Sequence, residues 1–116
     1  MTAAEVLTSL VDAGVVVWAE GDRLRFSAPT GALTVELRAH AARLRPSLIA
    51  LVRSGVVLPA DLEAWSESVA HEREERAGIL EFDAGMTRPA AEREAERLVR
   101  GAFTRAAIQK LLPRRT

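Results

Sequence analysis

The sequence predicts an α+β fold, in which a small helix–β-hairpin–helix–helix module is followed by a helical C-terminal extension. One observation is a helix with marked ends over residues 2–14, followed at once by two short alternating segments around Gly21-Asp22. Another is helical periodicity, punctuated by prolines, through the rest of the chain. We expect residues 1–55 to form the module and residues 59–116 to form an extension of two to four helices.

The first predicted helix has signals at both of its ends. Thr2 and Glu5 stand at the spacing of a capping box, in which each side chain binds the other residue's backbone N–H. Gly14 suits the left-handed position that closes a helix. The apolar residues between these ends share one helical stripe, made of Leu7, Leu10 and Val11.

The next segment predicts a β-hairpin with a two-residue loop. Glycine at the first loop position, Gly21, favours a type II′ turn with Asp22. Because side chains alternate along a strand, one face of the hairpin is wholly apolar and has to be covered. Counting outward from the loop gives the members of this face as Val15, Val17, Ala19, Leu24, Phe26 and Ala28. The same count gives the opposite, mixed face as Val16, Trp18, Glu20, Arg23, Arg25 and Ser27.

Further helices are predicted after the hairpin. Thr34 is a candidate N-cap, and Pro46 suits the first turn of a third helix that ends near Gly55. The apolar positions of the helix between them are Val35, Leu37, Ala41 and Leu44. In the extension, a helix from residue 60 places Leu62, Trp65 and Val69 on one stripe. We expect that helix either to span solvent or to break near Gly78, and we expect Gly101 to interrupt the last one.

Catalytic and metal-binding motifs are missing from the sequence. There is no cysteine, and neither His40 nor His71 has a second histidine at metal-ligand spacing. We find no glycine-rich phosphate loop and no serine nucleophile motif, and the carboxylates of residues 72–96 alternate with arginines as on a solvated helix face. We therefore predict a non-enzymatic protein without metal or cofactor. Since the N-terminus shows neither a signal peptide nor a membrane span, we expect a cytoplasmic protein.

Charge is balanced in total but uneven along the chain. The formal net charge is zero, yet no acidic residue follows Glu96. The basic residues beyond it are Arg97, Arg100, Arg105, Lys110, Arg114 and Arg115. This basic tail is a candidate contact for phosphate or an acidic partner, and the alternative is a solvated face favoured near a helix C-terminus. Few aromatic residues and zero net charge weigh against nucleic-acid binding.

Trp18 and Arg25 stand opposite each other on the mixed face of the predicted hairpin. They either form a cross-strand cation–π pair, worth about 0.5–1 kcal/mol when exposed, or join Val16 in a contact patch. The hairpin also has two open edges, and an open edge accepts an extended peptide as an extra strand. A module with so small a core gains stability from pairing with a second copy.

Several short motifs between residues 3 and 53 agree in order and spacing with one known family. They are Gly14-Val15, Trp18, Gly21-Asp22, Leu24-Arg25-Phe26, Ala28-Pro29, Gly31, Leu33-Thr34, Glu36-Leu37 and Pro46. The segment resembles the N-terminal docking domain of the tubulysin-synthase type (TubC-like), also called the β-hairpin docking domain. The resemblance implies the fold derived above and a homodimer. It also implies that the hairpin receives a C-terminal segment of another subunit, as in nonribosomal peptide and polyketide assembly lines.

The resemblance implies a partner-binding surface and no catalytic residue. It points to the second strand, with Arg23 and Arg25 as charged contacts and Trp18 and Val16 as the apolar part. We predict the partner-binding residues to be Val16, Trp18, Glu20, Arg23, Arg25 and Ser27. The predicted function is a docking or adaptor protein that captures a partner segment at the hairpin.

The extension departs from that family, because in the synthases a large catalytic domain follows the docking domain. Here helical residues follow the module instead, so we do not expect an assembly-line subunit. Residues 59–116 loosely resemble the helical tails of phage and mobile-element proteins. One alternative hypothesis is a phage or mobile-element protein that binds and inhibits a host complex, such as a defence nuclease. Another is a small nucleic-acid-binding accessory protein that uses the basic tail.

Overall fold

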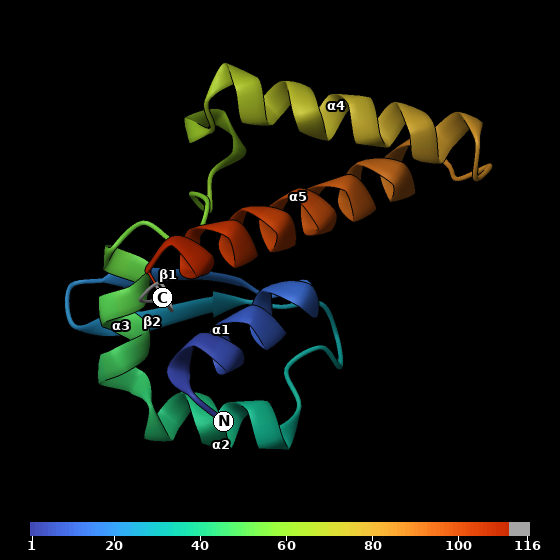
Figure 1. Cartoon of the computed structure of the whole chain (residues 1–116). Coiled ribbons are helices and arrows are strands. Elements are labelled where there is room, and N and C mark those ends of the chain that lie inside the picture. Colours follow the sequence, from blue (N-terminus) through green and yellow to red (C-terminus); the bar gives the residue numbers. More distant parts are fainter. Residues whose placement is uncertain (112–116) are drawn as a thin grey trace, which may run out of the picture.

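A computed structural model describes residues 1–111 and has the predicted α+β architecture (Figure 1). In chain order the elements are α1 (Ala3–Asp12), β1 (Val16–Glu20), β2 (Arg23–Ser27), α2 (Val35–Arg43), α3 (Arg45–Arg53), a short 3₁₀ helix (Leu62–Ala64), α4 (Glu67–Phe82) and α5 (Arg88–Leu111). None of the helices described is long and apolar enough to cross a membrane. The predicted contacts Arg114 and Arg115 lie outside the described residues.

The capping box of α1 is confirmed. Thr2 Oγ1 accepts the backbone N–H of Glu5 at 3.1 Å, and the Glu5 carboxylate accepts the N–H of Thr2 at 3.0 Å. The hydrogen bonds that the Glu5 carboxylate accepts from Thr2, first from the backbone N–H and then from the side chain, lower the pKa of Glu5. Gly14 has φ +90°, the left-handed conformation expected at the end of this helix.

The hairpin register is also confirmed. Trp18 pairs with Arg25 and Glu20 pairs with Arg23, which leaves Gly21 and Asp22 as the loop. Gly21 has φ +60°, and no residue other than glycine has a positive φ among those described, which fits the predicted type II′ turn. The register follows from the loop length, so a purely local signal sets which side chains share a face.

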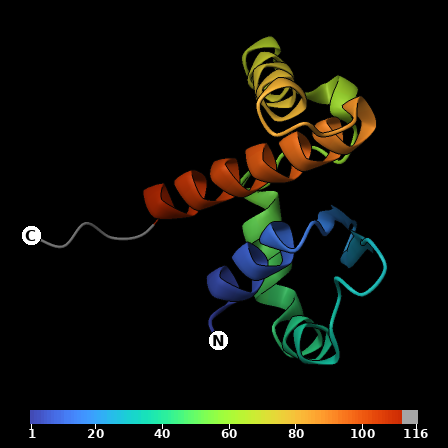
Figure 2. The same ribbon diagram turned by 90° about the vertical axis from the view of Figure 1, so that its right-hand side faces the viewer.

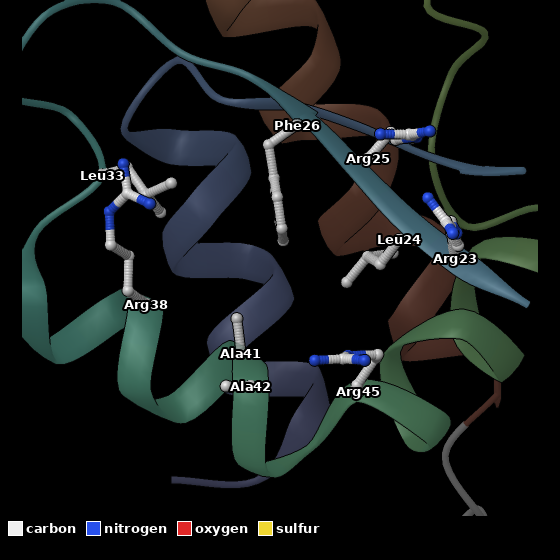
Figure 3. A pocket seen from close by; sticks show the side chains of 9 residues that line it. All are labelled: Arg23, Leu24, Arg25, Phe26, Leu33, Arg38, Ala41, Ala42 and Arg45. Atoms are coloured by element: carbon white, nitrogen blue, oxygen red, sulfur yellow. The ribbon is translucent and has the colours of Figure 1, made fainter.

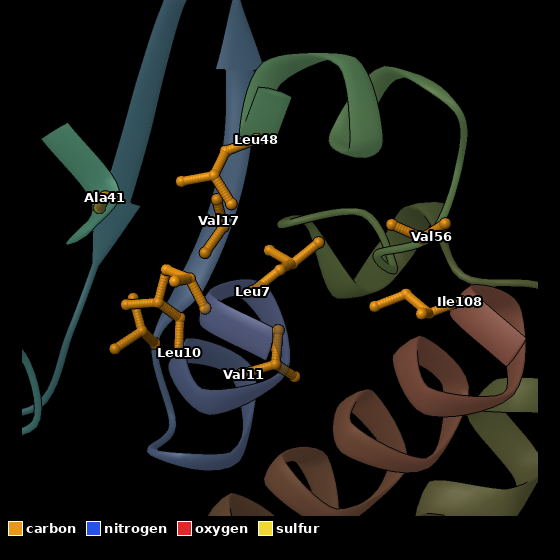
Figure 4. Packing of buried hydrophobic residues seen from close by; sticks show 10 residues of the cluster. Leu7, Leu10, Val11, Val17, Ala41, Leu48, Val56 and Ile108 are labelled. Atoms are coloured by element: carbon orange, nitrogen blue, oxygen red, sulfur yellow. The ribbon is translucent and has the colours of Figure 1, made fainter. Parts of the chain in front are cut away.

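The core lies between α1 and the apolar face of the hairpin, with α2 and α3 contributing from the side (Figure 4). Leu7 and Leu10 of α1 and Leu48 of α3 are fully buried there, beside Val17 of β1. Ile108, near the end of α5, belongs to the same cluster. The extension therefore shares a core with the residues that form the N-terminal module.

The extension is a helical hairpin stacked on the module. In both views α5 lies between α4 on one side and α1 with the hairpin on the other, and α2 lies furthest from α4 (Figures 1 and 2). Fully buried alanines, Ala77, Ala91 and Ala95, let α4 and α5 approach closely. The Arg88 guanidinium binds the carboxylates of Glu74, Glu81 and Glu92, which raises its pKa. The division of the chain between residues 55 and 59 stays a prediction.

The helix boundaries in the extension differ from those expected. Gly101 does not interrupt a helix, because α5 is continuous from Arg88 to Leu111, and α4 runs through Gly78 without a break. Trp65 precedes α4, whose N-cap is Ser66, although its side chain still joins the cluster of Leu62 and Val69.

Val35 is not an apolar contact of α2, since it is 79% exposed. Leu37, Ala41 and Leu44 follow each other at helical spacing on one face, and Ala41 is buried among core residues. Val35 lies only two positions before Leu37, and a separation of two places a side chain on nearly the opposite side of a helix.

Candidate functional site

A groove of about 630 Å³ runs between β2 and α2 (Figure 3). Its lining comes from β2, from the loop before α2, from α2 itself and from the start of α3. The lining residues are Arg23, Leu24, Arg25, Phe26, Leu33, Arg38, Ala41, Ala42 and Arg45. It combines an apolar floor with a charged rim, and its volume exceeds the roughly 510 Å³ of a second groove beside α5.

The groove exists because the helices cover the hairpin unequally. Val15, just before β1, and Val17 on β1 are buried, whereas Leu24 and Phe26 on β2 are only half-buried. Figure 3 shows the side chains of Leu24 and Phe26 pointing toward α2, where the facing residue is a small alanine, Ala41. The apolar face of β2 is therefore partly open to solvent.

The rim of the groove is strongly basic. Four arginines line it, and no carboxylate does. Within residues 1–111, Arg23, Arg38 and Arg45 form no ion pair, while Arg25 Nε donates to the Glu20 carboxylate at 2.8 Å. Three guanidinium groups thus keep their hydrogen-bond donors available for a ligand.

Only one edge of the hairpin borders this groove. The sheet has two strands, and residues 57–58 together with Thr104 of α5 lie against Val15, Val16 and Val17 on the β1 side. The Arg53 guanidinium donates to the Gly21 carbonyl at the turn. In a two-residue hairpin the pairs Glu20–Arg23 and Trp18–Arg25 bond to each other, so the backbone groups of Leu24 and Phe26 point outward from β2.

Of the two alternatives for Trp18 and Arg25, the cation–π pair does not form. Among the described residues the one such contact is Arg100 over the Trp65 ring, at 5.0 Å from its centroid. The Arg25 guanidinium turns instead to Glu20, diagonally across the same face, because a charge-assisted hydrogen bond is stronger than an exposed cation–π contact. Trp18 is half-buried, and Glu20, Arg23, Arg25 and Ser27 are exposed.

The six predicted partner-binding residues share one face of the hairpin but border different grooves. Arg23 and Arg25 line the groove beside α2, whereas Val16 and Ser27 line a second groove of about 510 Å³ between the hairpin and α5. Arg93 and Arg97 of α5 border that second groove. Sequence reasoning missed this division because it depends on where a helix some seventy residues away in the chain is packed.

The arginines of the predicted basic tail mostly bind the chain itself. Arg97 donates to the Asp12 carbonyl at 2.9 Å, and Arg105 forms an ion pair with the Asp12 carboxylate. Hydrogen bonding between Arg97 and Glu94 raises the pKa of Arg97 and lowers that of Glu94. Of the described tail residues, only Lys110 is both exposed and free of an ion pair with another described residue.

Arg100 is buried rather than available to a partner. Its guanidinium donates to the Glu96 carboxylate at 2.9 Å and to the carbonyls of Pro59 and Ala60 at 3.0 and 3.2 Å. With the Trp65 ring beneath it, this side chain ties the linker before α4 to α5. The sequence shows the charge of Arg100. It does not show that the carbonyl groups to which Arg100 donates lie in a non-helical segment about forty residues earlier.

All nine residues of the groove beside α2 lie between residues 23 and 45. Residues 4–53 match the model of the TubC N-terminal docking domain. This match confirms the resemblance predicted from the motifs, and it places the whole groove inside the TubC-like docking segment. No curated protein and no solved structure matches the chain. Among residues 1–111 no group of three or more histidine, aspartate or glutamate side chains is placed to hold a metal ion.

Sequence reasoning missed three of the lining residues that matter most, namely Leu33, Arg38 and Arg45. Arg38 and Arg45 carry a weak signal, since both flank the buried Ala41 at spacings of three or four residues. Their placement opposite β2 depends on how α2 packs, which the sequence pattern does not specify.

Proposed function

We propose that this protein is a non-catalytic docking protein that captures an extended, acidic and apolar segment of a partner protein along β2. The observation that carries the proposal is the open edge of β2, which borders a groove with an apolar floor, four arginines and no carboxylate. The TubC-like match of residues 4–53 supports a docking role for the same segment.

The backbone of the partner segment binds as a third strand. The outward N–H and C=O groups of Leu24 and Phe26 offer the hydrogen bonds of a ladder, as other peptide-binding proteins do at an exposed sheet edge. These bonds give affinity without selecting a sequence, because every residue except proline has the same backbone groups.

The side chains of the segment provide selectivity. Since they alternate, the apolar set lies over the groove and packs on Leu24 and Phe26, and the acidic segment as a whole is attracted by Arg38 and Arg45 on the rim. The other set lies beside Arg23 and Arg25, where carboxylates are favoured. We therefore expect a partner motif in which acidic and apolar residues alternate.

Trp18 and Val16 have a supporting role in this proposal. They lie on β1, one strand away from the edge where the segment binds. Glu20 holds Arg25 in place along the hairpin, and Ser27 marks the end of the strand that pairs with the segment. Alanine substitution of Trp18 is expected to weaken docking less than reversal of the groove arginines.

A capped synthetic peptide, Glu-Leu-Glu-Val-Glu-Leu-Glu, tests the proposal by calorimetric titration. We expect binding, and a loss of about tenfold or more in affinity for Arg38→Glu/Arg45→Glu, since each reversal replaces attraction by repulsion. Arg43→Glu is the matched control for Arg45→Glu, because Arg43 ends α2 only two positions before Arg45, is exposed and does not line the groove. Equal affinities for the Arg43→Glu and Arg45→Glu variants contradict the proposal.

The same titration separates docking from the nucleic-acid hypothesis. A peptide of the same composition with its four glutamates placed in one block keeps the charge but loses the alternation. Docking predicts that this peptide binds at least tenfold more weakly, because its apolar residues no longer fall on one face. Simple attraction of anions to arginines predicts that both peptides bind equally well. It also predicts that a single-stranded oligonucleotide binds, with an affinity that falls more steeply with salt concentration than that of the peptides.

A further inference from the structure

The end of α4 presents the most exposed large apolar side chain among the described residues. Phe82 is 83% exposed, and Ile79, one helical turn before it, is 58% exposed. We call residues 77–87 the arm tip. It contains two acidic residues, Glu81 and Asp83, and no basic one.

The charges of the arm tip and of the groove beside α2 are complementary. Asp83 forms no ion pair with any other residue in the described part of the chain, as is also true of Arg23, Arg38 and Arg45 in the groove. The carbonyl end of α4 adds partial negative charge beside Phe82. The groove offers what this tip lacks, namely an apolar floor that includes Phe26 and a rim of arginines.

The arm tip cannot reach the groove of its own chain. Figures 1 and 2 show α4 and α2 on opposite sides of the molecule, with α5 and α1 between them. The α4–α5 turn projects at one end of the molecule, away from the hairpin and α2 (Figure 1). A contact between tip and groove therefore has to join two copies.

We propose that the arm tip of one copy docks into the groove beside α2 of a second copy. Phe82 packs on Leu24 and Phe26, a contact between aromatic and aliphatic side chains that removes its exposed ring from water. Asp83 and the carbonyl end of α4 face Arg38 and Arg45. This contact uses the groove of the proposed function but does not depend on the proposed partner peptide.

Two consequences follow from the geometry of this contact. It joins different surfaces of the two copies, so it grows into chains or closes into a ring rather than forming a two-fold dimer. It also occupies the groove, so self-association and peptide capture exclude each other. The apparent affinity for a docking peptide then falls as the protein concentration rises.

Mixing two complementary variants of the full chain tests the proposal by sedimentation velocity. Phe82→Ala keeps the groove but lacks the apolar tip, and Arg38→Glu/Arg45→Glu keeps the tip but lacks the basic groove. We expect each variant alone to associate about tenfold more weakly than wild type, or not at all. An equimolar mixture is expected to form a one-to-one pair that grows no further. Leu111→Ala, which removes another exposed apolar side chain, is the control and is expected to associate as wild type does.

Three results overturn the proposal. One is a wild-type chain that stays monomeric up to about 1 mM, where even weak contacts are populated. Another is unchanged association of Phe82→Ala. The third is a loss in Phe82→Ala with wild-type association in Arg38→Glu/Arg45→Glu, which indicates that the tips pair with each other. Peptide binding by Phe82→Ala is measured separately, so failure of self-association and failure of peptide docking are told apart.

Discussion

The carboxylate oxygen Oδ1 of Asp12 lies 2.7 Å from the position that a Cβ on Gly101 would occupy. Asp12 ends α1 and Gly101 lies within α5, so this is a point of close approach between the N-terminal module and the extension. Arg105 and Arg97 fix the same residue by its carboxylate and its carbonyl. A glycine inside a long helix is thus explained by a tertiary contact.

Gly101→Ala and Gly78→Ala form a matched pair that tests this contact. Both glycines are inside helices, but nothing lies within 4 Å of a Cβ placed on Gly78. We expect Gly78→Ala to raise the free energy of unfolding by about 0.5–1 kcal/mol through helix propensity. Gly101→Ala has to displace the Asp12 carboxylate from Arg105. We therefore expect this cost to cancel the stability gained through helix propensity. Equal stabilisation in urea denaturation would show that the contact is unimportant.

Ile108 tests whether the extension supports the module. It is 8% exposed and packs in the same core as Leu7 and Leu48. We expect Ile108→Ala to lower the free energy of unfolding by about 2–3 kcal/mol, the usual cost of truncating a buried aliphatic side chain. Leu111→Ala, at a position 54% exposed, is expected to change it by less than about 0.5 kcal/mol. A similar, small change in both variants means that α5 is not part of the core.

Arg100 joins the linker before α4 to α5 through hydrogen bonds to Glu96 and to three backbone carbonyls. Because the guanidinium is buried, its removal leaves those acceptors without donors. We expect Arg100→Ala to destabilise the protein by about 3 kcal/mol. Arg93→Ala, on the same helix, is expected to cost less than about 1 kcal/mol. The comparison is made by chemical denaturation, and similar losses in both variants argue against the buried network.

Stability is expected to fall in mild acid. Hydrogen bonds from Arg97 lower the pKa of Glu94, and those from Thr2 lower the pKa of Glu5. A carboxyl whose folded pKa is depressed stabilises the fold above its unfolded value, near about 4.3, and that stability is lost as the pH falls through the folded pKa. The free energy of unfolding, measured by urea denaturation between pH 6 and pH 3, should therefore decline. Glu94→Gln should flatten the decline, and an unchanged slope contradicts the assignment.

The parts of the fold that were predicted correctly are those set by local sequence. The capping box of Thr2 and Glu5 and the pairing of Trp18 with Arg25 each follow from residues only a few positions apart. Contacts such as that of Arg97 with Asp12, separated by 85 positions, have no periodic signal. The candidate site divides in the same way: the second strand was predicted to contact a partner, whereas the groove beside it and its opposite wall with Arg38 were not predicted.

Hydrogen exchange at the backbone amides of Leu24 and Phe26 tests the docking proposal most directly. These amides point outward from β2, while those of Arg23 and Arg25 already bond to β1. On addition of the alternating Glu-Leu-Glu-Val-Glu-Leu-Glu peptide, we predict that the exchange rates of the Leu24 and Phe26 amides fall about tenfold or more, and that those of Arg23 and Arg25 change little. Unchanged exchange at Leu24 and Phe26 with the peptide bound would contradict strand addition along β2.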